Sequence, residues 1–310
     1  MQQRGLNTIV VGFWLTTMTW LVVTKVLPPL ERGEPPNYQT LYGGLDPAAP
    51  PVCWDVTWND QPIGWAVCRA VRPAAGMLEI LSRVHFARLP LQDMAPVWMR
   101  SILQSAGNSL SRLEMDAFSQ LEIDPLNRLT GFRSSIRLAH VPEAIVVHGT
   151  VEGTRLKLRV DAGDVSYCPP DISLPPDALL GDQLSPQSRM PGLHVGQSWT
   201  VPVYNPLQPD SPMEVLQAIV EGHEPIAWDG RGVDTLVVVY RSDPGSALGT
   251  ARLPHSKLWV DQTGTVLRQE TWLFGSRLAF VRLGKAAATA RRGAATDVLS
   301  EMLQRAAESQ

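Results

Sequence analysis

Cysteine is scarce in this chain, and neither sign of charge dominates. Three cysteines among 310 residues are too few for a domain held together by many disulfides. Lys and Arg total 27 and Asp and Glu total 30, which gives a formal net charge of −3. Nucleic-acid-binding domains normally carry clustered Lys and Arg on a basic surface. We therefore exclude nucleic acid as a partner.

Motifs for catalysis and cofactor binding are also missing. The sequence has no HExxH, no pair of CxxC motifs, no GxSxG elbow, no Walker motif and no dinucleotide fingerprint. Glu114 and Asp116 share one strand face, but nothing marks them as acid and base, and Cys168 is followed by prolines instead of a helix. We predict no catalytic residue, no metal site and no cofactor. The six histidines are scattered singly, at His85, His140, His148, His194, His223 and His255.

The first apolar run predicts a membrane anchor. Residues Gly5 to Thr24 carry no formal charge, and at ~1.5 Å per residue a helix of this length covers the ~30 Å hydrocarbon layer. A cleaved secretory signal is the alternative, but no small-x-small site precedes Lys25. Arg4 favours a cytoplasmic N-terminus. We expect residues 1–27 to form an uncleaved single-pass anchor in the inner membrane, with residues 6–27 in the bilayer and the rest in the periplasm.

A proline-rich segment follows the predicted anchor. Residues 28–51 contain seven prolines, which disfavour a helix and predict an extended tether. The folded domain is then expected over 52–285, as one large β-domain or two smaller units. Residues 169–191 are again proline-rich and predict a long loop. From Ala286 to Gln310 the composition predicts a weakly amphipathic helical tail, which either packs on its own domain or binds a partner.

Alternating apolar residues predict a mainly β fold. Residues 52–58 and 63–68 read as a hairpin, and about a dozen period-two segments in all predict antiparallel strands in a meander. Residues 96–110 are expected to form a helix that crosses the sheet. Asp261 to Gly264 has the residues of a tight turn, with glycine where a positive φ is needed. The other predicted strands lie near 77–88, 112–123, 132–140, 144–151, 155–166, 197–204, 213–224, 233–242, 253–261, 265–274 and 277–283.

Three segments carry a resemblance to a known family. Gln61 to Gly64, Gly192 to Trp199 and Lys257 to Arg268 resemble a bacterial periplasmic family of unknown function. Its fold is similar to that of the LolA/LolB lipoprotein carriers, and a related module precedes the catalytic domain of some transglutaminase-like proteins. The resemblance covers about residues 52 to 285. It implies a half-barrel, meaning one broad curved antiparallel sheet whose apolar concave face is partly closed by helices or loops, and it implies no reaction.

Tryptophan is abundant, and most of its ten copies fall in predicted strands. Aromatic side chains suit ordinary β cores, but they also line apolar ligand grooves. One hypothesis is therefore a membrane-tethered binding module for a lipid, a lipidated protein or another hydrophobic ligand. The alternative is a structural or scaffolding subunit of an envelope complex with a filled core. The candidate ligand-binding residues are Trp54, Val56, Trp58, Trp65, Trp199 and Trp259.

Hairpin register predicts a disulfide between Cys53 and Cys68. If Asn59 lies opposite Pro62, the same register places these two cysteines directly opposite each other. Opposed residues in antiparallel strands have Cα atoms ~4.5 to 5.5 Å apart, which a disulfide accepts. The alternative is two reduced cysteines, which a β-bulge would produce by breaking the register.

Overall fold

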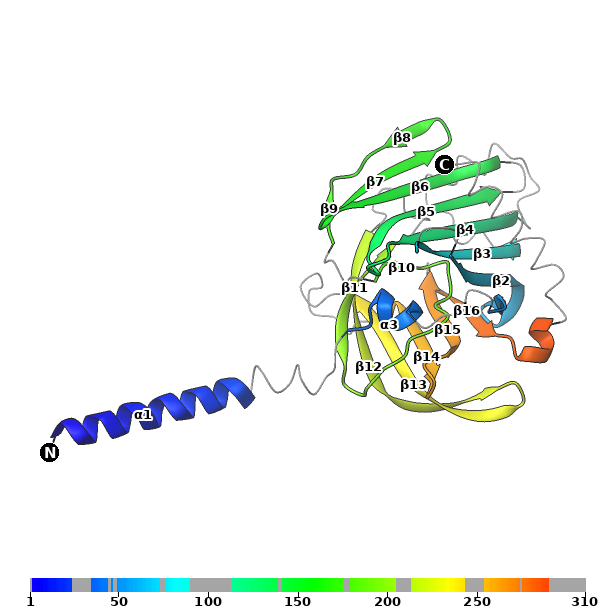
Figure 1. Ribbon diagram of the computed structural model, residues 1–310. Coiled ribbons are helices and arrows are strands. Elements are labelled where there is room, and N and C mark those ends of the chain that lie inside the picture. Colours follow the sequence, from blue (N-terminus) through cyan, green and yellow to red (C-terminus); the bar gives the residue numbers. More distant parts are fainter. Residues whose placement is uncertain are drawn as a thin grey trace.

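Most of the residues described by the computed structural model lie in one large β-sheet (Figure 1). This architecture confirms the mainly β part of the predicted fold class, with few helices. The described residues are 2–23, 35–43, 46, 49–72, 76–89, 113–138, 141–174, 179–204, 213–242, 254–273 and 275–289.

The strands of this sheet form two consecutive series. In the first half they are β1 (Val52–Trp58), β2 (Gln61–Val71), β3 (Leu78–Leu89), β4 (Leu113–Ile123), β5 (Leu129–Leu138), β6 (Val141–Glu152), β7 (Arg155–Ala162), β8 (Val165–Tyr167) and β9 (Ile172–Ser173). In the second half they are β10 (Gly181–Asp182), β11 (Ser198–Tyr204), β12 (Met213–Trp228), β13 (Arg231–Ser242), β14 (Ser256–Asp261), β15 (Val266–Leu273) and β16 (Ser276–Arg282).

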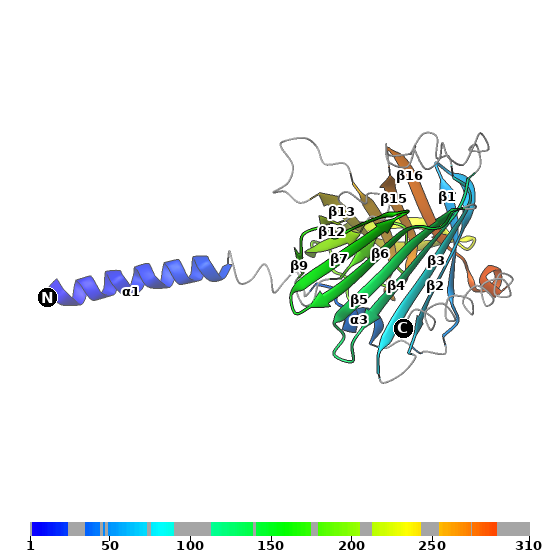
Figure 2. The same ribbon diagram turned by 90° about the horizontal axis from the view of Figure 1, so that it is seen from above.

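The two series join through β1 and β16, which pair antiparallel in the middle of the sheet. From there the sheet runs through β2 to β8 in one direction and through β15 to β10 in the other. The short β10–β11 pair is parallel, and β9 pairs with β7 beside the main path. Figures 1 and 2 show that the two halves bend toward each other, so the sheet is open and strongly curved.

The concave face of the sheet holds the main core. Strand β7 shows the pattern most clearly, because Leu156, Leu158 and Val160 are buried and the residues between them are exposed. Alternation of this kind puts every second side chain on the inner face. One contiguous cluster of buried side chains draws on both halves of the sheet, and this cluster defines the concave face.

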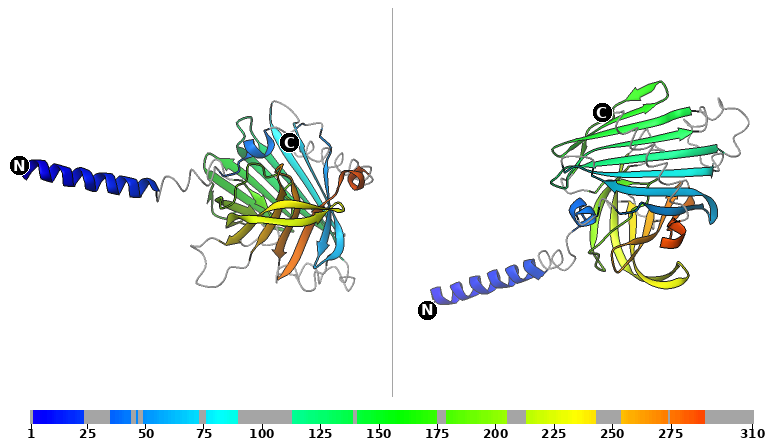
Figure 3. Two further views of the ribbon diagram at one scale, coloured as in Figure 1. Left: turned by 90° about the horizontal axis from the view of Figure 1, so that it is seen from below. Right: turned by 45° about the vertical axis from the view of Figure 1, so that its right-hand side comes forward.

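A helix and a loop close part of the concave face. Helix α3 (Tyr38–Tyr42) lies in the bend between the two halves (Figure 3), and residues 179–190, here called the cover segment, run beside it. The amide of Leu180 donates to the Tyr38 hydroxyl at 2.9 Å, and the amide of Met190 donates to the Gly264 carbonyl at 2.7 Å. These contacts attach the cover segment to both α3 and the second half of the sheet.

Helix α3 corrects the prediction that residues 28–51 form an extended tether. Asn37 caps the helix, accepting a hydrogen bond from the Thr40 amide at 2.9 Å, while the Thr40 side chain accepts from the Asn37 amide. Tyr38, Leu41 and Tyr42 are buried in the core. No proline occurs between Pro36 and Pro47, so a short capped helix forms inside a segment whose composition disfavours one.

The first hairpin differs from the predicted register. Asn59 and Asp60 both have positive φ, 46° and 67°, so they form a two-residue turn and Trp58 pairs with Gln61. A bulge then shifts the register between Val56 and Thr57. Residues beyond the bulge pair one position away from the predicted partners.

The turn between β14 and β15 has the predicted form. Gly264 has a φ of 77°, and a Cβ at this position would lie 2.4 Å from the Cα of Pro191 in the chain that follows the cover segment. The Asp261 side chain accepts hydrogen bonds from the amides of Thr263 and Thr265, each at 2.8 Å. Glycine is required here both for the backbone conformation and for the close approach.

The N-terminal apolar run forms helix α1 (Gln2–Leu21), which lies apart from the sheet (Figure 1). Within the described part of the chain, however, no helix is both long enough and apolar enough to cross a membrane. The predicted anchor over residues 1–27 is therefore not supported, since Gln2, Gln3, Arg4 and Asn7 occupy the first two turns of α1. The periplasmic location of the domain stays a prediction.

Two predicted helices fall mainly outside the described residues. The expected helix over 96–110 lies wholly outside them. Of the predicted tail over 286–310, only the start is described, as a helical turn over 285–289.

Replacing Trp54 by alanine tests the packing of the concave face. Trp54 is fully buried, so we expect Trp54→Ala to lower the free energy of unfolding by about 3 to 5 kcal/mol, as measured by chemical denaturation. Trp65→Ala is the matched control, because Trp65 lies half-buried on the opposite face and should cost clearly less. Equal losses for the two variants would contradict the assignment of faces.

Candidate ligand cavity

A cavity of about 360 Å³ lies on the concave face between the sheet and its cover. Two cross-strand rows of side chains line it. One row passes from Val52 through Cys68 and Ser82 to Ser119, and it crosses β1, β2, β3 and β4. Because Cys and Ser are small, this row leaves space that larger inward side chains fill elsewhere on the sheet.

The second row is apolar. It consists of Ala70, Ile80 and Leu121, which are directly paired across β2, β3 and β4. All three are partly buried and pack against the main core. The cavity therefore has a wall with small polar groups beside a wall of hydrocarbon.

The cover segment and α3 close the cavity. Tyr42 of α3 and residues 185–189 of the cover segment line it, as does Asp182. The Gln187 amide donates to the Gln269 side chain of β15 at 2.8 Å, which fixes the cover segment to the sheet. Burial raises the pKa of the Tyr42 phenol, so this hydroxyl stays protonated throughout the physiological range.

Asp182 is a partly buried carboxyl at the wall of the cavity. Its side chain accepts a hydrogen bond from the Leu184 amide at 2.9 Å and another from the Ser185 hydroxyl at 2.8 Å. Burial raises the pKa of Asp182 above its ordinary value, although these hydrogen bonds act in the opposite direction. The protonated, neutral form is thus favoured relative to an aspartate in water.

Arg282 brings a positive charge to the same cavity. It follows Leu278 and Phe280 on the inward side of β16, and its guanidinium lies 5.8 Å from the ring centroid of Trp54. Its Nη1 donates to the carbonyl oxygen of Ser188 at 2.9 Å. Burial lowers the pKa of Arg282, but an arginine stays charged at any pH near neutrality.

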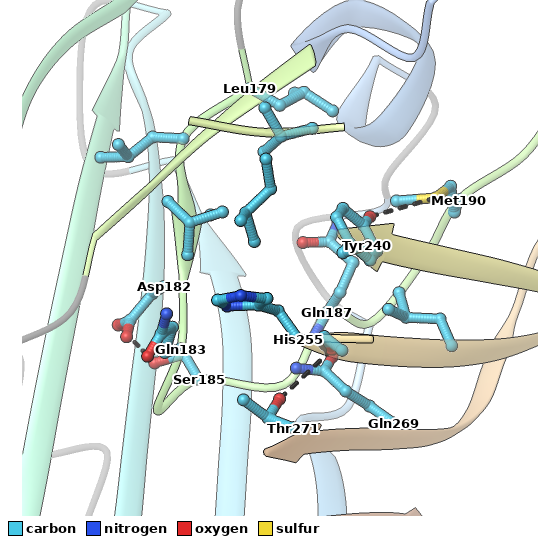
Figure 4. Close-up of a pocket in the computed structure, with 17 residues that line it drawn as sticks. Leu179, Asp182, Gln183, Ser185, Gln187, Met190, Tyr240, His255, Gln269 and Thr271 are labelled. Carbon is cyan, nitrogen blue, oxygen red and sulfur yellow. Dashed lines mark hydrogen bonds between the residues drawn. The ribbon is translucent and has the colours of Figure 1, made fainter. Parts of the chain in front are cut away.

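A second, smaller cavity of about 70 Å³ lies next to the first (Figure 4). Leu180, Asp182, Ser185 and Gln187 line both. Figure 4 shows the His255 ring pointing into the smaller space. Its other walls are mostly apolar and include Met190, Val201 and Leu258.

The predicted ligand-binding residues do not line either cavity. Trp54, Val56, Trp58 and Trp199 belong to the filled part of the main core. Trp65 and Trp259 lie on the opposite, convex face, in two separate small clusters. The bulge in the first hairpin explains why Trp65 lies on the convex face. The predicted register placed Trp65 and Val67 on the inner face, whereas the bulge turns Ala66 inward in their place.

The two-residue turn and the bulge together remove the predicted disulfide. Cys53 pairs with Val67, and Cys68 pairs with Val52, so the two cysteines are not opposed. Cys53 belongs to a cluster on the convex face, whereas Cys68 belongs to the concave core. Neither forms a disulfide. Burial raises the pKa of the Cys68 thiol to about 11, so it is protonated at neutral pH.

A polar cluster lies on the convex face, where His85 approaches Glu114 and Asp116. Their ligand atoms lie within 4.8 Å of one another, which is close enough for a shared metal ion. However, the Arg83 guanidinium lies 2.9 Å from Asp116 and already compensates its charge. Burial alone would raise the pKa of Asp116, but hydrogen bonds from His85 and Arg83 outweigh it and hold the pKa below the usual range.

Another polar cluster joins Ser242, His255 and Glu214 at the ends of β12 and β13. The Ser242 hydroxyl lies 2.9 Å from His255 Nε2, and His255 Nδ1 lies 3.5 Å from Glu214. These residue types also occur in nucleophilic catalysis. The Ser242 hydroxyl also lies 3.3 Å from Glu214 Oε1, and the direction of its contact with His255 depends on the imidazole tautomer. The absence of catalysis stays a prediction.

Sequence reasoning missed the charged residues of the cavity, although one of them left a signal. Leu278, Phe280 and Arg282 alternate along a predicted strand, so Arg282 occupies an inward position in an apolar series. A charge at such a position is a candidate for function. Asp182 gave no comparable signal, because it lies in a proline-rich segment whose path across the sheet has no periodicity.

Two solved bacterial structures are similar to this chain. One is a β-barrel-like protein of domain of unknown function DUF1849 from Brucella abortus, which is 8% identical with a TM-score of 0.45 over 75% of this chain and 94% of that chain. The other is a DUF1089 family protein from Pseudomonas aeruginosa, which is 15% identical with a TM-score of 0.32 over 68% of this chain and 90% of that chain.

No family model matches the chain, and no curated protein matches it significantly. The LolA/LolB resemblance and the link to transglutaminase-like proteins stay predictions.

Thiol labelling tests the corrected hairpin. In folded protein at pH 8, we expect iodoacetamide to modify only the exposed Cys168 within minutes, because Cys53 and Cys68 are buried. After unfolding without reductant, mass spectrometry should show three modified thiols. A single reactive thiol in the unfolded, unreduced chain would instead indicate the disulfide that the structure excludes.

The raised pKa of Asp182 predicts a pH dependence of stability. Because the folded state holds this proton more tightly, the stabilisation is fully present below the unfolded value near ~3.9 and is lost as pH rises through the folded pKa. Asp182→Asn should therefore gain stability relative to the parent protein between pH 4 and pH 8, as measured by chemical denaturation. The control is Asp164→Asn at an exposed turn. A constant difference across this pH range would contradict the assignment.

Proposed function

We propose that this protein is a non-catalytic binding module that holds a small hydrophobic or amphipathic ligand on its concave face. The observation that carries the proposal is the cavity of about 360 Å³ beneath the cover segment. Ligand pockets typically measure ~300 to 1,000 Å³ and combine mostly apolar walls with a few placed polar groups. The Ala70, Ile80 and Leu121 row supplies hydrocarbon, and the Cys68, Ser82 and Ser119 row supplies small polar groups.

The size of the cavity favours binding over the alternative of a structural subunit with a filled core. Protein interiors pack at the density of organic crystals, and voids much larger than a water molecule are rare. An empty cavity also costs stability in proportion to its volume. Outside the two cavities, large side chains such as Trp54 and Phe280 fill the concave face, so the empty space is confined to one part of it.

A lipid chain is the ligand class that we propose first. The sides of the cavity run across neighbouring strands, which are ~4.8 Å apart, so the Val52 to Ser119 row spans three strand intervals or roughly 14 Å. An elongated hydrocarbon suits this space. The same chain could come from a free lipid or from a lipidated protein.

Filling the cavity tests the proposal. The neutral probe N-phenyl-1-naphthylamine should bind the full-length protein with a rise in fluorescence. Ala70→Phe places a ring in the cavity and should weaken this binding by about tenfold or more, because a methylene-sized clash already matters in a packed site. Ala227→Phe is the matched control, since Ala227 is an exposed strand alanine, and it should change the affinity less than about twofold.

Native mass spectrometry of the same preparations supplies a second measurement. We expect co-purified lipid on the parent protein and on Ala227→Phe, and less on Ala70→Phe. No probe binding and no co-purified ligand on the parent protein would support the structural-subunit alternative.

A further inference from the structure

Three arginines line the large cavity, but Arg69 of β2 shares the convex face with Leu81, its partner on β3, so two face the concave space. Arg282 enters it from β16, and Arg189 enters it from the cover segment. Each is only partly exposed. In the described part of the chain, no carboxylate lies within ion-pairing distance of either guanidinium.

The contacts of Arg282 leave most of its donors without an anion. Nη1 donates to the carbonyl oxygen of Ser188 at 2.9 Å and lies 3.5 Å from that of Val266. The guanidinium also lies over the Trp54 ring, in a cation–π contact. These are neutral partners, and five N–H donors are available in an arginine fork.

A second positive charge, on Arg189, increases the free-energy cost of keeping Arg282 charged in the cavity. Burial disfavours the charged form of Arg282, and the charge of Arg189 disfavours it further. Cys68 and Asp261 act in the opposite direction, but Cys68 is a neutral thiol at this depth. Two like charges on one partly enclosed space are stabilised by an anion between them.

Two carboxyl groups line the cavity, the exposed Asp46 and the partly buried Asp182, and Asp182 does not neutralise these arginines. The two carboxyl oxygens of Asp182 accept hydrogen bonds from Leu184 and Ser185 of its own segment. Its environment favours the protonated form. The positive charge of the cavity is therefore not balanced from within by Asp182.

The cationic and the apolar side chains of the cavity lie on different strands of the sheet. Arg282 lies on β16, next to β1, whereas the apolar row of Ala70, Ile80 and Leu121 runs over β2, β3 and β4. Moving from β16 to β4 crosses four strand intervals, or roughly 19 Å. A ligand that follows the cavity thus meets charge at one end and hydrocarbon at the other.

We infer that the ligand is an amphiphile with one apolar chain and an anionic head group, with the head at Arg282 and Arg189 and the chain along Ala70, Ile80 and Leu121. This inference rests on the proposed binding function and adds the chemical class of the ligand. Arg282 is the residue on which recognition of the head group depends most, because it is the more fixed of the two by its contacts with Trp54 and Ser188.

Three probes separate the chain from the charge. Isothermal titration of the full-length protein at pH 8 with decanoate, 1-decanol and acetate compares an anionic amphiphile, its neutral counterpart and the head group alone. We expect decanoate to bind at least about tenfold more tightly than 1-decanol, as one charge-assisted hydrogen bond contributes at least that ratio. Acetate should bind far more weakly than either.

Variants locate the charge. Arg189→Met and Arg282→Met should each weaken decanoate binding about tenfold or more and leave 1-decanol binding within about twofold. Arg282→Lys should retain part of the preference for decanoate, because it keeps the positive charge. Arg155→Met removes an exposed arginine of β7 far along the sheet and should change neither affinity. Arg189→Met carries the test if Arg282→Met fails to fold.

The possible results test the anionic class of the ligand separately from the proposed binding function. Equal affinities for decanoate and 1-decanol would overturn the anionic class and leave the binding function intact. Acetate binding as tight as decanoate would overturn the amphiphile and indicate a site for small anions. If neither chain-bearing probe binds, the proposed function itself fails.

Discussion

The pairing of β1 with β16 is the constraint on which the rest of the structure depends. It joins strands from the two ends of the domain and converts two series of hairpins into one sheet. The turn residues of the first hairpin strengthen this junction, because the Asn59 amide donates to the Arg277 carbonyl and the Asn59 side chain accepts from the Arg277 amide, both at 2.9 Å. Without the junction, each half would expose an additional strand edge.

The junction also positions the cavity. Arg282 lies opposite Trp54 because β16 and β1 are in register there, and Val52, two residues before Trp54, begins the row that continues through Cys68. The fold thus brings a cation from the last strand beside the polar and apolar rows of the first four. The cover segment can then close the space, since its backbone amides bond to the Gln269 side chain of β15 and to the Gly264 carbonyl.

Much of this fold could be predicted from the sequence, because period-two alternation reports which segments are strands. The predicted strands near 77–88, 132–140 and 233–242 match β3, β5 and β13 within a few residues. Alternation does not report bulges, however. One extra residue in β2 was enough to exchange the faces of Trp65 and Ala66, and together with the two-residue turn it separates Cys53 from Cys68.

The cavity was less predictable for a different reason. Its space arises from small side chains that face each other across strands, and small residues such as Ser82 and Ser119 give no apolar signal in one dimension. Its cover comes from residues 38–42 and 179–190, which lie in two proline-rich stretches of the sequence, and proline indicates loops but not where they dock. Tertiary contacts alone place Tyr42 and Asp182 at the wall of the same cavity.

The most direct measurement is a crystal structure of the full-length protein with bound 10-bromodecanoate, in which anomalous scattering locates the bromine. The account predicts a bromine peak beside Ala70, Ile80 and Leu121, with the carboxylate near Arg282 and Arg189. A cavity closed by side chains, or bromine found only outside it, would contradict the account.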